Sequence, residues 1–185
     1  MKKTVGVLSL QGGFSKHFEK LQQLNVNPLL VRTKEELALC DGLILPGGES
    51  TTMSRHLTRQ NLLDPISEFA KSRPVFGTCA GLILLAKRVA GSEMKTLDAM
   101  DITVERNGYG SQINSFSTFL EMKSKKIPAL FIRAPVIQNC SNEVEILLTH
   151  NNSPVLIRQN HLLGATFHPE LTDSLLIHRF FVKLL

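Results

Sequence analysis

The sequence predicts an α/β fold, a three-layer sandwich in which a mixed β-sheet lies between two layers of helices. Two observations predict it. In the first half of the chain, short strands that are apolar throughout alternate with helical patterns, which is typical of a parallel sheet covered on both faces. In the second half, strand-like segments follow one another with short turns between them, which predicts antiparallel additions to that sheet. At 185 residues, one domain over residues 1–185 is expected.

The expected elements of the first half are each delimited by a turn signal. Apolar residues from Phe14 to Leu24 recur at helical spacing. Thr33 and Glu36 have the spacing of a capping box, which predicts a short helix over residues 35–40. Another helix is expected after residue 50 or 51, and others over 62–71 and 82–86. The expected strands are residues 4–10, 29–31, 42–45 and 74–76.

The second half is expected to add strands and a closing helix. The helix over residues 175–184 has an amphipathic pattern. In folds of this kind the active site lies beyond the carboxyl ends of the parallel strands, and three glycine-rich turns, 11–13, 46–49 and 77–81, fall at such ends. The expected strands are residues 102–105, 115–121, 129–132, 144–148, 155–158 and 163–167.

Composition argues against several classes of function. The net charge is +5, but the basic residues are scattered without a stripe of stacking aromatics, so no nucleic-acid partner is expected. No apolar run has the length needed to cross a bilayer, and no signal-like segment opens the chain. Three cysteines, an odd number, indicate a reducing compartment, so a cytoplasmic protein is expected. Cysteine and histidine spacings suggest no metal site.

Cys79 is the expected nucleophile. The segment Gly77-Thr78-Cys79-Ala80-Gly81 has the form Gly-x-Cys-x-Gly between a strand and a helix, the thiol version of the nucleophile elbow. Small neighbours let the strand and the helix approach closely, and the positive end of the helix favours a thiolate. The backbone N–H of Ala80 can donate to an oxyanion. Without this context a free cysteine is usually a small buried residue, the interpretation given to Cys40. Cys140 is expected in a turn over residues 139–142, and neither of these cysteines is assigned a role.

His168 is the expected base and Glu170 its orienting carboxylate. On an extended segment, residues i and i+2 face the same side, so Glu170 can reach the imidazole of His168 while Pro169 stiffens the link. The strand over 163–167 would carry His168 to its carboxyl end. The other five histidines are interpreted as surface or satisfied core residues: His17, His56 and His178 on helices, and His150 and His161 in turns.

The turn Pro46-Gly47-Gly48-Glu49 is the expected second half of an oxyanion site. It lacks the Gly-Lys-Ser/Thr ending of a phosphate loop. Two glycines let the backbone present N–H groups to an oxygen anion, so Gly48 and Ala80 would together hold a tetrahedral intermediate. An ordinary tight turn is the alternative interpretation of this segment taken alone.

Together these residues resemble the class I, or triad, glutamine amidotransferases. The resemblance narrows to the glutaminase subunits of pyridoxal phosphate synthases and covers nearly the whole chain in the family's order. It implies the flavodoxin-like class I amidotransferase fold. The segments that carry it are Val7-Leu8-Ser9-Leu10-Gln11-Gly12, Leu45-Pro46-Gly47-Gly48-Glu49-Ser50-Thr51-Thr52, Phe76-Gly77-Thr78-Cys79-Ala80-Gly81-Leu82, Phe131-Ile132-Arg133-Ala134-Pro135 and Phe167-His168-Pro169-Glu170-Leu171-Thr172.

The resemblance also implies an activity, a partner and a substrate pocket. L-Glutamine would be hydrolysed to glutamate and ammonia without a cofactor, and the ammonia would pass to a barrel-shaped synthase subunit that makes pyridoxal phosphate. The turn with Gln11 would meet that partner, without which the glutaminase is largely silent. Ser111 stands where the family usually has arginine. The residues expected around glutamine are Gly47, Gly48, Glu49, Arg106, Ile132 and Arg133.

Three other functions remain open from the sequence. The chain could serve another pathway as a glutaminase subunit, such as histidine biosynthesis, which a different synthase would stimulate. A catalytically silent regulatory subunit would not require the triad of Cys79, His168 and Glu170. A cysteine peptidase-like hydrolase of the same fold is the third alternative.

Overall fold

The computed structural model of the chain describes residues 2–106, 108, 115–122 and 124–185. Its central sheet, within these residues, has seven strands in the order β10-β11-β12-β4-β3-β1-β2. The five strands from β12 to β2 are parallel, whereas β11 is antiparallel to β12 and β10 to β11. The mixed sheet predicted from the sequence is confirmed, with the strand order of flavodoxin-like folds in its parallel part. The strands are β1 (Thr4–Leu8), β2 (Asn27–Val31), β3 (Gly42–Leu45), β4 (Val75–Thr78), β10 (Glu145–His150), β11 (Ser153–Gln159) and β12 (Leu162–Ala165).

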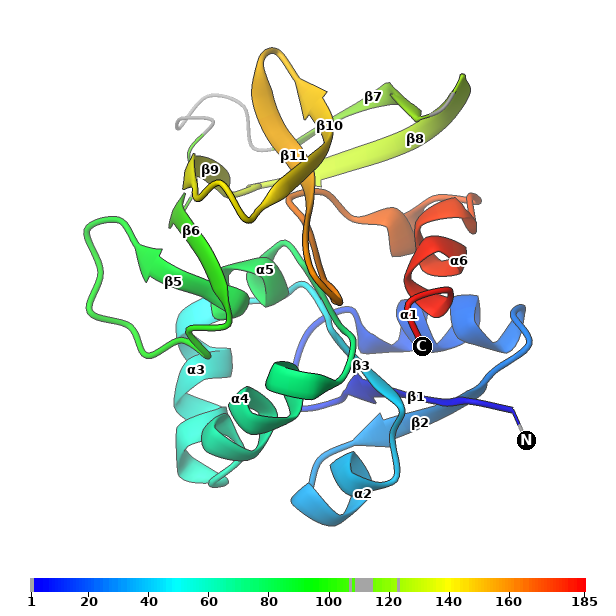
Figure 1. Cartoon of the computed structure of the whole chain (residues 1–185), viewed down its shortest axis with the longest axis vertical. Helices are drawn as coiled ribbons and strands as arrows, with labels where there is room; N and C mark the ends of the chain where they lie inside the picture. Colours follow the sequence, from blue (N-terminus) through cyan, green and yellow to red (C-terminus); the bar gives the residue numbers. More distant parts are fainter. Residues whose placement is uncertain (1, 107, 109–114, 123) are drawn as a thin grey trace.

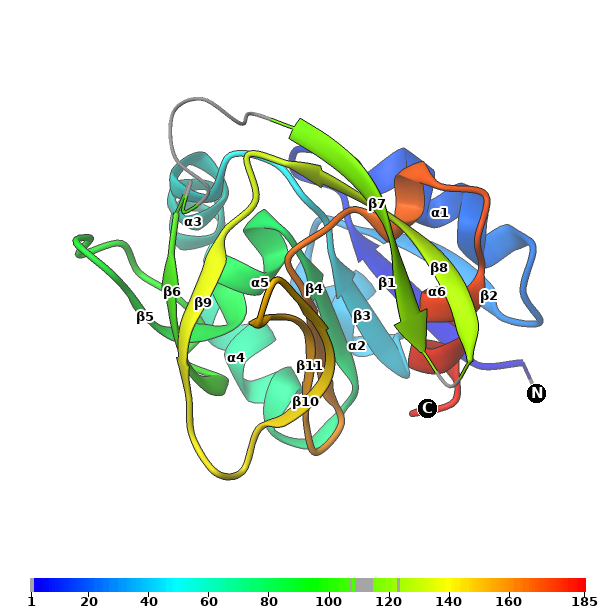
Figure 2. The ribbon, with the colours of Figure 1, turned by 90° about the horizontal axis from the view of Figure 1, so that it is seen from above.

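Two layers cover the sheet, as Figures 1 and 2 show. One face packs against α2 (Lys34–Ala38), α3 (Ser50–Arg59), α4 (Leu63–Ser72) and α5 (Ala80–Leu85). The other face packs against α1 (Phe14–Gln22), α6 (Leu176–Val182) and a hairpin of β7 (Ser115–Met122) and β8 (Lys125–Ile132).

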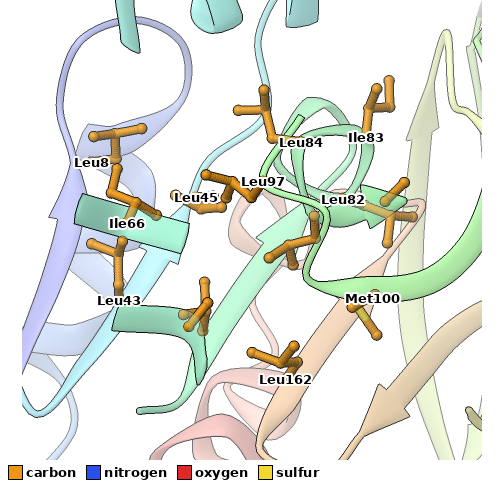
Figure 3. Close-up of a cluster of buried hydrophobic side chains, with 14 of the residues drawn as sticks. Leu8, Leu43, Leu45, Ile66, Leu82, Ile83, Leu84, Leu97, Met100 and Leu162 are labelled. Atoms are coloured by element: carbon orange, nitrogen blue, oxygen red, sulfur yellow. The ribbon is translucent and has the colours of Figure 1, made fainter. Parts of the chain in front are cut away.

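Strand β3 shows how the sequence produces the layers. Its side chains alternate between the two faces, so Leu43 and Leu45 join the cluster beneath α2–α5 while Ile44 joins the opposite cluster. All three are fully buried, and burial of each contributes about 1.5–3 kcal/mol. Figure 3 draws Leu43 and Leu45 in one cluster with Ile66 of α4 and Leu82 of α5.

Three strands expected in the central sheet lie elsewhere, so that part of the prediction is wrong. Strand β6 (Met100–Glu105) pairs with β5 (Ala86–Val89) and β9 (Val136–Cys140) in a separate sheet, and β7 pairs only with β8 among the described residues. In β8 only alternate residues are buried, from Ile127 to Phe131. One buried face fits a hairpin that covers the sheet beside α1 and α6, whereas strands inside the parallel sheet are buried on both faces.

Smaller differences concern element ends. The first strand stops at Leu8, the helix after Cys79 ends at Leu85, and the last helix spans Leu176–Val182. Cys140 closes strand β9, which was not predicted, instead of lying in a turn. None of the helices in the described part of the chain combines the length and the apolar character that crossing a bilayer requires.

Candidate active site

Cys79 lies at the sharp turn between β4 and α5. It follows the last residue of β4, caps α5, and has φ 49° and ψ −104°, outside the regions that residues with side chains prefer. Its N–H donates to the carbonyl of Ala165 in the neighbouring strand β12, at 2.8 Å. Such a backbone costs about 1–3 kcal/mol and persists only where the surroundings hold it. The thiol is therefore placed by the parallel sheet.

The positions that flank this turn leave no room for a side chain, so they must be glycines. A Cβ on Gly77 would lie 2.6 Å from the carbonyl of Gly81, and one on Gly81 would lie 2.0 Å from the carbonyl oxygen of Leu45. Both distances are far below a normal contact. The close approach of strand and helix expected from the Gly-x-Cys-x-Gly pattern is confirmed.

His168 and Glu170 are paired, although not for the reason given by the sequence. Nδ1 of His168 lies 2.7 Å from Oε1 of Glu170. The residues between them are not extended as predicted: Pro169–Leu171 form a 3-10 helix, and β12 ends at Ala165. The N–H of His168 donates to the carbonyl of Leu130 in β8 at 2.8 Å, which fixes the backbone at the start of the turn.

The pair is electrostatically coupled to Cys79. Burial lowers the pKa of His168, but hydrogen bonds with Cys79 and with Glu170 outweigh it and raise the pKa to about 10. The Glu170 side chain is almost completely buried, which raises its pKa, but interactions with His17 and His168 outweigh burial and lower the pKa overall. At neutral pH the imidazole of His168 is therefore positively charged and paired with the Glu170 carboxylate.

A cavity of about 400 Å³ opens at these groups. That is the size of pockets that bind small molecules. All the predicted site residues line it together with the turn at Gly12 and Gly13: Gly47, Gly48, Glu49, Cys79, Ala80, Arg106, Ile132, Arg133, His168 and Glu170. Ser111, where the sequence departs from the family pattern, lies outside the described residues.

The Gly47 turn lies directly against His168 and Cys79. A Cβ on Gly47 would meet the imidazole of His168 and, at 3.5 Å, the Cβ of Cys79. The carbonyl of Gly47 accepts a hydrogen bond from the N–H of Gly13 at 3.1 Å. Since the C=O and N–H of a trans peptide point in opposite directions, this bond fixes the direction of the Gly48 N–H. The Gln11–Gly13 turn and the expected oxyanion donor are thus physically linked.

The charged residues at the mouth of the cavity have partners of their own. Glu49 caps α3, its carboxylate accepting from the N–H and hydroxyl of Thr52 and the N–H of Thr51 at 2.6–3.0 Å. The hydroxyl of Thr52, followed by the backbone donors, lowers the pKa of Glu49 to about 2. Arg106 donates from Nη1 to the hydroxyl of Thr51 at 2.6 Å, whereas Arg133 is exposed with a φ of 43°.

Two histidines that were interpreted from the sequence as surface or core residues lie behind Glu170. His17 and His178 are fully buried, and Nε2 of His17 lies 3.4 Å from Oε2 of Glu170. The sequence feature that could have indicated a buried partner for His17 is its place on the helix. It falls on the apolar face of α1, between Phe14 and Leu21, where a polar side chain requires a partner.

The remaining histidines and cysteines are not among the described residues that line the cavity. His161 lies in a turn with Nε2 2.8 Å from the carbonyl of Ala70, whereas His150 ends strand β10 instead of lying in a turn. Burial raises the pKa of the Cys40 thiol to about 11, as expected of a core residue. The described residues contain no group of three or more histidine, cysteine or acidic side chains able to hold a metal ion.

Comparison with known proteins gives consistent matches over nearly the full length. The profile of the SNO glutamine amidotransferase family matches residues 7–185. A protein of Thermotoga petrophila named pyridoxal 5'-phosphate synthase subunit PdxT is 48% identical over 184 residues, 97% of this chain and 98% of that protein. A protein of the same name from Ruminiclostridium cellulolyticum is 45% identical over 188 residues, 99% of this chain and all of that one. A crystal structure described as a glutamine amidotransferase matches with a TM-score of 0.93 at 41% identity, covering 97% of each chain.

Proposed function

Since the chain belongs to the SNO glutamine amidotransferase family, we propose that it is the glutaminase subunit of a pyridoxal 5'-phosphate synthase. It hydrolyses L-glutamine to L-glutamate and ammonia. The observation that carries the proposal is that Cys79, at its strand-to-helix turn, and the hydrogen-bonded pair of His168 and Glu170 line one cavity.

The first chemical step is the attack of Cys79 on the carboxamide carbon of glutamine. His168 holds the proton that the thiol gives up, and the imidazolium stabilises the thiolate by charge. As the tetrahedral intermediate collapses, His168 protonates the departing nitrogen, which leaves as ammonia while a thioester remains on Cys79. Water, deprotonated by His168, then attacks the thioester and releases glutamate. Glu170 keeps the imidazole oriented and stabilises its positive form throughout.

The N–H groups of Gly48 and Ala80 hold the oxyanion of each tetrahedral intermediate. One such donor contributes roughly 3–4 kcal/mol of transition-state stabilisation in comparable hydrolases. The proposal is supported by the position of both residues in the cavity wall beside Cys79. The bond between Gly13 and Gly47 supports a further point: the Gln11–Gly13 turn sets the direction of the Gly48 donor.

The polar ends of glutamine are recognised at the mouth of the cavity. Among the described residues that line the cavity, Arg106 and Arg133 carry guanidinium groups, which suit the α-carboxylate because a guanidinium binds a carboxylate with two parallel hydrogen bonds. Glu49 keeps its negative charge at any pH near neutrality because its pKa is about 2, so it suits the α-ammonium group. Gly47 and Ile132 shape the wall between these ends and the thiol.

The ammonia is delivered to a synthase subunit with which the chain forms a hetero-oligomer. Support comes from the name of the relatives, which describes them as one subunit of a pyridoxal 5'-phosphate synthase. We propose that residues 1–185 work as a single glutaminase domain, since both core clusters share the central sheet. A cytoplasmic location is supported by the three cysteines, all of which are free.

Glutaminase assays with and without the candidate synthase test the proposal. The wild-type chain should release ammonia and glutamate in equal amounts when the synthase is present, and Cys79→Ala should abolish the release. Cys140→Ala is the matched control, because this half-buried cysteine lies in β9 and should be dispensable. Ammonia release that survives in Cys79→Ala would overturn the assignment of the nucleophile, and stimulation only by the synthase of another pathway would overturn the assignment of the partner.

A further inference from the structure

A row of buried polar side chains continues behind the proposed triad. It runs from Glu170 to His17 of α1 and then to His178 of α6. Nε2 of His17 lies 3.4 Å from Oε2 of Glu170 and 3.1 Å from the hydroxyl of Thr78 in β4. Nδ1 of His17 lies 3.0 Å from Nε2 of His178. Three separate elements therefore bring their side chains to the side of Glu170 that faces away from His168.

The hydrogen-bond partners of these side chains determine which ring nitrogen of each histidine carries a proton. Within the described residues, Nδ1 of His178 has no hydrogen-bond partner. Burying an N–H without an acceptor costs free energy, so the proton of His178 belongs on Nε2, which donates to Nδ1 of His17. His17 must then carry its own proton on Nε2. That N–H donates to the hydroxyl of Thr78. The same nitrogen lies 3.4 Å from Oε2 of Glu170, the oxygen that His168 does not use, which has no hydrogen-bond partner within the described residues.

Both histidines are neutral in this environment. Burial lowers the pKa of His17 and lowers the pKa of His178 to about 3. The ring of Phe76 stands edge-on to both histidines, with its centroid 6.2 Å from that of His17 and 6.1 Å from that of His178. The charged or titratable groups that act on them are Glu170 and His168 on the cavity side and Lys20 beside His178.

We propose that His17 is a positioning residue for the glutaminase: its Nε2–H lies beside the otherwise unpartnered second oxygen of Glu170 and attracts it, so that the first oxygen stays directed at His168. His178 acts one step further back, because its N–H selects the tautomer of His17. Without His17 the carboxylate keeps only one imidazole donor in a nearly water-free site, where an unpaired charge is costly. This inference rests on the proposed function, since it assigns a role within the same site.

Two amide substitutions at His17 separate this role from simple packing. In His17→Gln the side-chain amide extends to about the place of Nε2, so it can still donate to Glu170. In His17→Asn the amide stops one bond earlier, near the place of Nδ1, and cannot reach Glu170. Leu21→Ala is the control for lost packing, because Leu21 is fully buried one turn further along α1 and belongs to the apolar cluster.

The first measurement is ammonia release with the synthase present. Removing a residue that orients a metal ligand typically costs about 10–100-fold in affinity or activity, and an orienting partner of a catalytic carboxylate is expected to have an effect of the same order. We expect a fall of about that size in the kcat of His17→Asn with an unchanged KM, a much smaller fall in His17→Gln, and none per folded molecule in Leu21→Ala.

The second measurement needs neither glutamine nor the synthase. The rate at which iodoacetamide alkylates Cys79 is followed against pH by mass spectrometry of the Cys79 peptide. Glu170 supports the imidazolium–thiolate pair only while ionised, and losing the His17 donor raises the pKa of its carboxyl. The acidic limb of the alkylation profile should therefore move to higher pH in His17→Asn and stay near the wild-type position in His17→Gln.

The outcomes distinguish a failure of the role proposed for His17 from a failure of the proposed glutaminase function. Equal kcat values and equal alkylation limbs in His17→Asn and His17→Gln would overturn the role of His17 while leaving the glutaminase assignment intact. An unmoved limb in His17→Asn with a wild-type kcat would do the same. If the wild-type chain released no ammonia with any synthase, the proposed function would fail. The pH of the acidic limb of Cys79 alkylation in the His17 variants would still show whether His17 acts on His168.

Discussion

A methyl group added at Gly47 should disable the site without unfolding the protein. In Gly47→Ala the new Cβ would lie 2.4 Å from Cε1 and 3.0 Å from Nδ1 of His168, and 3.5 Å from the Cβ of Cys79. Carbon atoms in contact are normally about 3.5–4.0 Å apart. The imidazole, the turn or both must therefore shift by about 1 Å. His168 cannot retreat easily, because its N–H is bonded to Leu130 and its Nδ1 to Glu170.

The magnitude follows from that displacement. A misplacement of about 1 Å in a reacting group can cost on the order of 100-fold in rate, and over-packing a tight site typically costs about 1–3 kcal/mol of stability. We expect the kcat of Gly47→Ala for ammonia release to fall by about two orders of magnitude, while the variant stays folded at 25 °C. Both quantities can be measured on one preparation, by a coupled assay for glutamate with the synthase present and by urea unfolding.

Gly13→Ala is the matched control. Gly13 lines the same cavity, yet a Cβ there would meet only Oε1 of Glu170 at 3.6 Å, an ordinary contact. This variant should keep kcat within a few-fold of the wild-type value, since no atom has to move. A Gly47→Ala enzyme with wild-type kcat would refute the geometry described for His168, and an equal loss in both variants would show that any added methyl group in this cavity is harmful.

Three further predictions concern the carboxylates and one helix cap. Glu170→Gln removes the charge that stabilises the His168 imidazolium, and kcat should fall by up to about 10⁴-fold with an unchanged circular dichroism spectrum. Glu49→Gln should lower stability at pH 6. Because folding lowers the pKa of Glu49 from 4.5 to about 2, this contribution is present above pH 4.5 and is lost as the pH falls toward 2, so urea midpoints of variant and wild type should converge there. Thr33→Ala breaks the observed capping box of α2 and should cost about 1 kcal/mol in urea unfolding, with kcat unchanged.

The strand-to-helix turn that carries Cys79 could be predicted from the sequence because its requirements are local. A thiol at a strand-to-helix turn needs small neighbours on both sides, and the distances at Gly77 and Gly81 show why. The capping box at Thr33 and Glu36 is local in the same sense and formed as expected. The alternation of buried strands and helices was also sufficient to predict the parallel part of the sheet.

What the sequence could not show depends on contacts between distant segments. The pairing of His168 with Glu170 was expected from an extended backbone, but a 3-10 turn produces it, and the bond of His168 to Leu130 of β8 fixes the start of that turn. His17 and His178 are separated by 161 residues and carry no local motif. Whether β7 and β8 extend the sheet or cover it is likewise decided by packing of their buried face, which the strand pattern alone leaves open.

The two halves of the proposed site are held in different ways, and this difference bears on control by a partner. Cys79 and His168 are bonded through their backbone N–H groups to strands β12 and β8, and Glu170 is enclosed by α1 and α6 through His17 and His178. The Gly48 donor instead belongs to a loop whose peptide orientation depends on a bond from another loop, between Gly13 and Gly47. A protein that displaces the Gln11–Gly13 turn would therefore reorient the oxyanion donor while leaving the thiol, imidazole and carboxylate in place. In our proposal, the triad is built to stay assembled, and the oxyanion turn is the part through which a synthase subunit can set the rate.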